Sequence, residues 1–120
     1  MPEHDPQLLK GVLTLVLLAF LAERESYGYE LVQRLHGAGL TGVADGTVYP
    51  ALARLEREGR VSARLVASSS GPARKYYRPT PAGYSALAEG AAGWFALTDM
   101  VTPVLSAPVP PSPASPTEEA

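Results

Sequence analysis

The side chains best suited to do chemistry in this sequence are basic and aromatic groups in two short segments. In segment 45–59, Tyr49, Arg54 and Arg57 fall away from an apolar helical face, and segment 74–78 reads Arg-Lys-Tyr-Tyr-Arg. Guanidinium and ammonium groups donate hydrogen bonds to phosphates and base edges, and aromatic rings add stacking surface. The chemistry that these residue types favour is the binding of nucleic acid.

The basic residues are concentrated in one stretch, although the formal net charge of the chain is −2. Seven of the ten are Arg54, Arg57, Arg60, Arg64, Arg74, Lys75 and Arg78. Only Glu56 and Glu58 oppose these seven charges within the stretch, so its charge is about +5, and no basic residue follows Arg78. One part of the molecule is therefore expected to be electropositive.

The sequence offers little for catalysis or metal binding. It contains no cysteine, and its two histidines, His4 and His36, are far apart and expected on the surface. A nucleophile paired with a base, or a cluster of metal ligands, is what an enzyme of this size would need. We therefore predict that the protein is not an enzyme and has no metal site or cofactor.

The first basic segment is predicted to be a helix. Its apolar face consists of Val48, Ala51, Leu52 and Leu55. Thr47 is expected to cap the start, and Pro50 is tolerated within a first turn, so the helix should begin near Gly46 or later, or kink at Pro50. Gly59 is expected to end it in the left-handed conformation.

A second helix is predicted to precede this one and to form a helix-turn-helix with it. Ser26 is expected to cap its start, and the helix should end near His36-Gly37. The connector is expected to be flexible because it is rich in glycine: Gly37, Gly39, Gly42 and Gly46.

A β-hairpin is predicted to follow, which makes the domain a winged helix. Alternate residues of its first strand are expected to face the core, and these are Val61, Ala63, Leu65 and Ala67. Segment 68–72 should form the turn, and 74–78 the returning strand. Strand packing is expected to account for one of Tyr76 and Tyr77, which leaves the other for DNA.

The apolar run from Gln7 to Ala22 is predicted to be a buried helix. It is shorter than the roughly 20 apolar residues of a membrane-spanning helix, and Glu3, Asp5 and the charged Glu23-Arg24-Glu25 argue against a signal peptide. A helix that is apolar on several faces needs more than one packing partner. The partners expected here are the domain core and a second subunit.

The C-terminal helix is predicted to begin at Thr80-Pro81, with Thr80 as its cap, and to end at Pro103. Apolar and small residues recur along it at the 3-4 spacing of a coiled-coil seam: Tyr84, Leu87, Ala91, Trp94, Thr98 and Val101. Such a seam favours a homodimer. The proline-rich residues that follow are predicted to be disordered.

Three motifs in order resemble the PadR family of bacterial transcriptional regulators. They are Gly46-Thr47-Val48-Tyr49-Pro50-Ala51-Leu52, then Arg54-Leu55-Glu56 with Gly59, then Arg74-Lys75-Tyr76-Tyr77-Arg78 with Thr80. Tyr27-Gly28-Tyr29-Glu30 and the leucine-rich first helix also match. The resemblance covers residues 7–102 and implies a winged-helix repressor that dimerises through one C-terminal helix, aided by the first helix. Pro79, where the family has an aliphatic residue, and the proline-rich tail depart from the pattern.

The expected protein is thus mainly α with a small β-hairpin, a winged helix-turn-helix at 7–79 and a dimerisation helix at 80–103, flanked by a flexible terminus at 1–6 and a disordered tail at 104–120. The expected DNA-binding residues are Tyr27, Thr47, Tyr49, Pro50, Arg54, Arg57, Arg74, Lys75 and Tyr76. The expected dimerisation residues are Leu13, Leu17, Tyr84, Leu87, Ala91, Trp94, Thr98 and Val101.

The predicted partners are double-stranded DNA, a second copy of the chain and a small aromatic effector stacked on Trp94, with no membrane. The predicted location is the bacterial cytoplasm. The alternative is a winged helix that contacts only other proteins, because the fold alone does not prove DNA binding.

Overall fold

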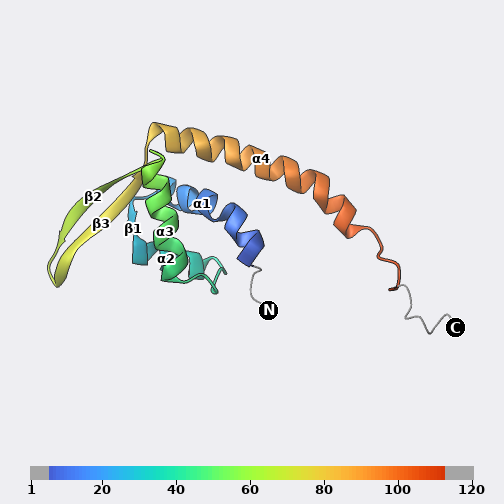
Figure 1. The fold of residues 1–120 in the computed structure, drawn as a ribbon, viewed down its shortest axis with the longest axis horizontal. Helices are drawn as coiled ribbons and strands as arrows, with labels where there is room; N and C mark the ends of the chain where they lie inside the picture. The colour runs from blue at the N-terminus through green and yellow to red at the C-terminus, as the bar shows by residue number, and fades with distance from the viewer. Residues whose placement is uncertain (1–5, 113–120) are drawn as a thin grey trace.

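The computed structural model describes residues 6–112, and in that range it contains four helices and one three-stranded sheet. In chain order the elements are α1 (Pro6–Glu23), β1 (Ser26–Tyr27), α2 (Gly28–Gly37), α3 (Asp45–Arg57), β2 (Val61–Ser68), β3 (Gly71–Pro79) and α4 (Pro81–Ser106). Helices α1 to α3 form a compact group, β2 and β3 project from it, and α4 passes over α1 and continues beyond it (Figure 1). The predicted winged helix-turn-helix with a C-terminal helix is confirmed.

The core lies where α1, α2 and α3 meet the base of the hairpin. Its buried apolar side chains are Leu13, Leu17, Leu18, Leu21, Leu31, Val32, Leu35, Val43, Val48, Leu52, Leu55, Val61 and Tyr77. Leu13 and Leu17 were expected at a subunit interface, and this expectation is wrong because their side chains are only 4% and 0% exposed within the single chain. The second partner of α1 is α4 of the same chain, and Gly90 permits a close approach to Leu15. None of the described helices is long and apolar enough to cross a membrane.

Helix α3 begins earlier than expected and ends as expected. Its first residue is Asp45, the capping position belongs to Ala44, and no side chain caps it, so Thr47 lies inside the first turn. Pro50 lies within the helix, where its ring removes the hydrogen bond to the carbonyl of Gly46. Gly46 is exposed, so water can reach its carbonyl. Gly46 is thus helical rather than part of the connector.

The C-terminus of α3 is closed by a Schellman motif. Gly59 has a φ of 74°. The N–H of Arg60 donates to the carbonyl of Leu55 at 2.8 Å, and that of Gly59 donates to Glu56 at 3.0 Å. The predicted role of Gly59 is confirmed, and the motif sets the direction in which the chain enters β2.

Ser26 was predicted to cap α2, and this is wrong. Ser26 lies in β1, pairs with Tyr77 of β3 and is fully buried. Its hydroxyl donates to the carbonyl of Arg24 and accepts from the guanidinium of Arg34 at 3.0 Å. Arg34 also donates to the carbonyl of Phe20, so it holds the end of α1 and β1 against α2.

The sheet has the order β1-β3-β2, so the hairpin gains a short third strand that the sequence analysis missed. Residues Val61 to Val66 pair regularly with Pro79 to Arg74, and an irregularity follows toward the turn. Pro79 therefore completes β3 instead of disrupting it. Leu65 was expected to face the core, but its side chain is 72% exposed because the hairpin projects beyond the helices there.

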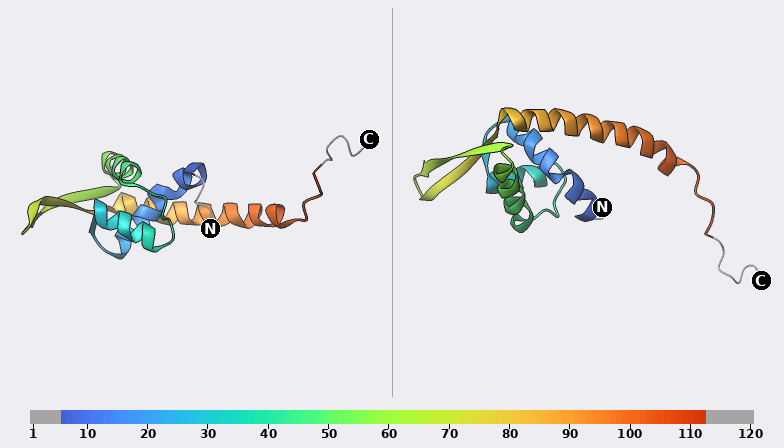
Figure 2. Two further views of the ribbon diagram at one scale, coloured as in Figure 1. Left: turned by 90° about the horizontal axis from the view of Figure 1, so that it is seen from below. Right: turned by 45° about the horizontal axis from the view of Figure 1, so that its top comes forward.

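Helix α4 starts as predicted and runs further than predicted. The hydroxyl of Thr80 accepts the N–H of Gly83 at 3.1 Å, and Pro81 is the first helical residue. The helix passes through Pro103 to Ser106 and lengthens the molecule to 71 × 31 × 22 Å (Figure 2). Of the tail predicted to be disordered, 104–106 are helical, 107–112 have no helix or strand, and 113–120 lie outside the described residues.

Candidate nucleic-acid interface

One side of α3 is free of the core and carries four of the nine predicted DNA contacts. Successive helical residues are about 100° apart, and the exposed positions that share this side are Gly46, Thr47, Pro50, Ala53, Arg54 and Arg57. We call these residues the exposed arc of α3. Val48, Leu52 and Leu55 fix the opposite side in the core, which presents the arc to solvent in a set orientation.

The wing lies against one edge of this arc. The ammonium group of Lys75 is 2.8 Å from a carboxylate oxygen of Glu56, which joins β3 to α3. This hydrogen bond is the main reason that the pKa of Lys75 is raised. Tyr49 lies on the same edge and packs its ring on Gly28, where a Cβ atom would overlap it. The pKa of Tyr49 is raised, mainly by burial, so the phenol stays protonated and can donate a hydrogen bond.

Three of the predicted contacts form an aromatic cluster where β1 meets β3. The rings of Tyr27 and Tyr76 are 5.2 Å apart between centroids. The guanidinium of Arg74 lies 4.5 Å from the centroid of Tyr27, as a cation–π pair. This stacking restrains a long side chain that would otherwise be mobile, and it keeps a positive charge beside the helix-turn-helix.

Four of the seven clustered basic residues form ion pairs within the chain. Arg54 and Arg60 share Glu58, Arg64 pairs with Glu25, and Lys75 pairs with Glu56. The other three, Arg57, Arg74 and Arg78, have no ion pair among the described residues. The pairs are exposed and so contribute little to stability. Phosphate groups can therefore replace these carboxylates at small cost.

The Glu25–Arg64 pair ties the α1–β1 connection to the wing. The guanidinium donates two hydrogen bonds of 2.7 Å to the carboxylate. These bonds are the largest cause of the lowered pKa of Glu25. A lowered carboxyl pKa stabilises the fold above the ordinary value of 4.5, and this contribution is lost as the pH falls through the folded-state pKa.

We expect Glu25→Gln to lower the thermal unfolding midpoint slightly at pH 7. As the pH falls through the lowered folded-state pKa of Glu25, the wild-type carboxylate becomes protonated and the difference should shrink toward zero. Thermal unfolding of both proteins, followed by circular dichroism at pH 7 and at pH 3, measures this difference. A difference of equal size at pH 3 and pH 7 would show that the carboxylate charge is not responsible.

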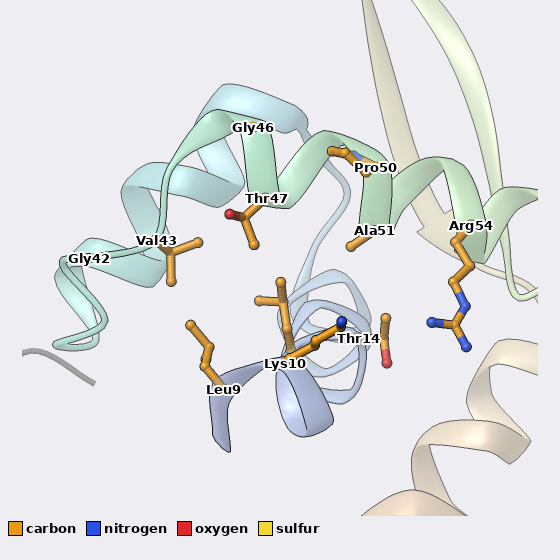
Figure 3. Close-up of a pocket in the computed structure, with 11 residues that line it drawn as sticks. Leu9, Lys10, Thr14, Gly42, Val43, Gly46, Thr47, Pro50, Ala51 and Arg54 are labelled. Carbon is orange, nitrogen blue, oxygen red and sulfur yellow. The ribbon is translucent and has the colours of Figure 1, made fainter. Parts of the chain in front are cut away.

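The structure brings all nine predicted DNA contacts onto or beside the arc, the wing and the β1–β3 cluster. Arg78 was not among the predicted DNA contacts, although it is exposed on β3 and close enough to Glu25 to help lower the pKa of that carboxyl. The position of Arg78 in the basic motif was the available signal. Lys10 was not predicted either, and it faces Arg54 across the space between α1 and α3 (Figure 3).

Comparison with known proteins identifies the family. The model of the transcriptional regulator PadR-like family matches residues 17–89, which span the helix-turn-helix, the wing and the start of α4. The chain belongs to the PadR-like family. Its members are transcriptional regulators and not enzymes, so this PadR-like protein is a DNA-binding regulator of transcription.

Individual relatives agree with this assignment. Transcriptional regulator Rv3488 of Mycobacterium tuberculosis is 42% identical over 81 residues, which are 67% of this chain and 73% of that protein. The crystal structure of a PadR-like transcriptional regulator from Bacillus cereus is 39% identical, with a TM-score of 0.76 over 85% of this chain and 99% of that one. A PadR family regulator from Eggerthella lenta is 35% identical, with the same TM-score, over 85% and 88% of the two chains.

Proposed function

We propose that this regulator represses transcription by binding a pseudo-palindromic operator as a homodimer. The observation that carries the proposal is the exposed arc of α3 beside a wing that bears Arg74 and Lys75. The arc enters the major groove and supplies base contacts from Thr47 and Arg54, with a further contact from Tyr49 at its edge, while the wing holds phosphates. A regulator of transcription acts where the chromosome is, so the proposal places it in the cytoplasm.

The uncovered apolar surface of α4 supports the dimer. Beyond Gly93 the helix leaves the core, yet its side chains remain apolar and exposed: Trp94, Phe95, Leu97, Met100, Val101, Val104 and Leu105. An exposed apolar surface of this kind on a protruding helix is typical of a protein–protein interface. Of the predicted seam, Leu87 packs on the core, whereas Tyr84, Trp94 and Val101 are exposed. A second copy of α4 is the occupant we propose, and two-fold symmetry makes its surface match.

Selection from random duplexes, followed by sequencing and gel retardation, tests the function. We expect an enriched sequence with two inverted half-sites whose centres are about 34 Å apart, or a multiple of that distance. Failure to retard any duplex at low salt would instead favour the winged helix that contacts only proteins.

Lys75→Ala should weaken binding to all duplexes similarly, and the slope of log affinity against log salt should become shallower by about one unit per site. Glu56→Gln is the matched variant. It removes the carboxylate that competes with phosphate for the same ammonium group, so it should strengthen binding. Retardation between about 50 and 200 mM salt measures both effects. An unchanged slope in Lys75→Ala would remove this residue from the phosphate contacts.

A small aromatic effector at Trp94 remains part of the proposal. The indole is 44% exposed and lines a groove between α1 and α4 with Gly90 and Gly93. A planar compound stacked there would release DNA only if it preferred a dimer with differently spaced recognition helices. Titration of planar compounds against Trp94 fluorescence, with Trp94→Ala as control, should then show quenching coupled to operator release.

A further inference from the structure

The wing presents two faces that point in opposite directions. Directly paired residues of an antiparallel hairpin share a face, and so do alternate residues along one strand. The register therefore places Leu65, Lys75 and Tyr77 on one face, which we call the inner face of the wing. Tyr77 is buried in the core, and Lys75 donates a hydrogen bond to Glu56 of α3, so the inner face is turned toward α3. The outer face is turned away from α3.

Three arginines form a row along the outer face, whose residues are Ser62, Arg64, Val66, Arg74, Tyr76 and Arg78. Arg64 pairs with Tyr76, so it lies level with the midpoint between Arg74 and Arg78. The three positions are therefore about 6.6 Å apart along the strands, which is close to the spacing of successive phosphates in one nucleic-acid strand. Arg74 stacks on Tyr27, so the row begins beside the helix-turn-helix.

Glu25 is the carboxylate that opposes this row. It accepts two hydrogen bonds of 2.7 Å from Arg64, and its pKa is lowered mainly by these bonds and further by the charge of Arg78. The pair is exposed, with 60% of the Arg64 side chain accessible, so it is weak and can open at small cost. Three arginines against this carboxylate leave the outer face positive.

The outer face suits a nucleic-acid backbone better than a protein partner. Protein interfaces are built around an apolar or aromatic centre. The exposed leucine of the hairpin, Leu65, lies on the inner face, and the outer Tyr76 is half-buried with its ring against Tyr27. A row of guanidinium groups instead matches a row of phosphates.

One duplex does not fit both faces of a flat hairpin. Facing layers of sheet pack about 10 Å apart, whereas a minor groove is about 6 Å wide. A duplex held by α3 and Lys75 therefore lies beside the inner face, and the arginines of the outer face are left for another duplex.

We propose that the outer face of the wing holds the phosphate backbone of a second DNA duplex, so that the operator-bound regulator bridges two DNA segments. Arg64 and Arg78 contact the phosphates, and Glu25 limits the contact by competing for Arg64. The second duplex is bound whatever its sequence, because only its backbone is contacted. Bridging rests on the proposed operator binding, whereas binding of a duplex by the outer face does not.

Capture of a second duplex on operator-coated beads tests the bridge. The full chain is bound to an immobilised operator, and a labelled duplex of unrelated sequence is added at low salt. Per retained protein, we expect at least fivefold less capture by the double variant Arg64→Gln with Arg78→Gln than by the wild type. Arg24→Gln is the matched control and should capture as the wild type does, because Arg24 is as exposed as Arg64, at 58% against 60%, but pairs with Glu30 of α2.

Glu25→Gln and Arg64→Gln break the same ion pair and should change capture in opposite directions. Loss of the carboxylate frees Arg64 for phosphate, so capture should rise at least twofold, whereas loss of the guanidinium should lower it. Simple disruption of the wing would lower capture in both variants. Capture that does not rise in Glu25→Gln, or that is unchanged in the double variant, would overturn the proposal.

Two further results would assign the outer face to another partner and overturn the bridge. Poly-L-glutamate that displaces the labelled duplex as well as unlabelled DNA of equal charge would assign it to an acidic protein segment. Loss of capture on an operator lengthened by one helical turn at each end would assign it to flanking DNA of the same duplex. Beads that retain no protein would count against operator binding itself. The outer face is then judged by gel retardation of the unrelated duplex, in which Glu25→Gln and Arg64→Gln should again act in opposite directions.

Discussion

Deletion of residues 94–120 should convert the protein to a monomer and lower operator affinity at least a hundredfold, which corresponds to about 2.7 kcal/mol. The deletion removes the part of α4 that has left the core and bears most of its exposed apolar side chains. A monomer holds only one half-site, so it loses the second set of DNA contacts. A cut before Thr80 would be less informative, since it would also remove Ala86 and Leu87, which pack on the core.

Sedimentation and retardation measure the two effects of this deletion. A chain that ends at Ser112 is the matched control, because it retains all of α4, and it should remain a dimer with unchanged affinity. The shortened chain should keep the thermal unfolding of its core. A shortened chain that still sediments as a dimer would place the interface elsewhere.

Gly83→Ala should destabilise the fold by about 3 kcal/mol. A Cβ atom at Gly83 would overlap the backbone carbonyl of Arg60, where the start of α4 packs against the connection between α3 and β2. Backbone cannot rotate aside as a side chain can, so α4 must shift. The shift would strain the bond from the N–H of Thr80 to the same carbonyl, now 3.0 Å long.

Gly93→Ala in the same helix is the control. No atom lies within 4 Å of a Cβ built there, so the substitution should stabilise α4 by up to about 1 kcal/mol through helix propensity. Urea unfolding of both variants gives the free energies. A Gly83→Ala variant as stable as the wild type would mean that the contact between α4 and the α3–β2 connection adjusts at little cost.

The sequence predicted those elements whose determinants are local. Thr80-Pro81 begins a helix, and Gly59 ends one, because each supplies the hydrogen bond or backbone angle that the helix end requires. Proline residues predicted the helix ends less well than these capping residues did. Pro50 and Pro103 both lie inside helices, because the carbonyls they leave unpaired belong to exposed residues, Gly46 and Asp99.

What the sequence could not predict depends on contacts distant in the chain. Ser26 is a residue type that often caps helices, yet it lies in the sheet because it pairs with Tyr77 and accepts a hydrogen bond from the partly buried Arg34. Leu65 continues the alternation of core-facing residues along β2, but the hairpin has passed the edge of the core at this position, so its side chain is exposed. Lys10 faces Arg54 in the structure, but it lies on another helix and in no recognisable motif, so nothing in the sequence indicated this proximity.

The central claim is that two copies of α3 with their wings read two half-sites of one operator. Sedimentation velocity with a labelled, selected duplex tests it most directly, alongside the same duplex with one half-site scrambled. The account predicts two chains on the intact duplex, and at least fiftyfold weaker binding to the scrambled one. One chain per duplex, with equal affinity for both, would contradict it.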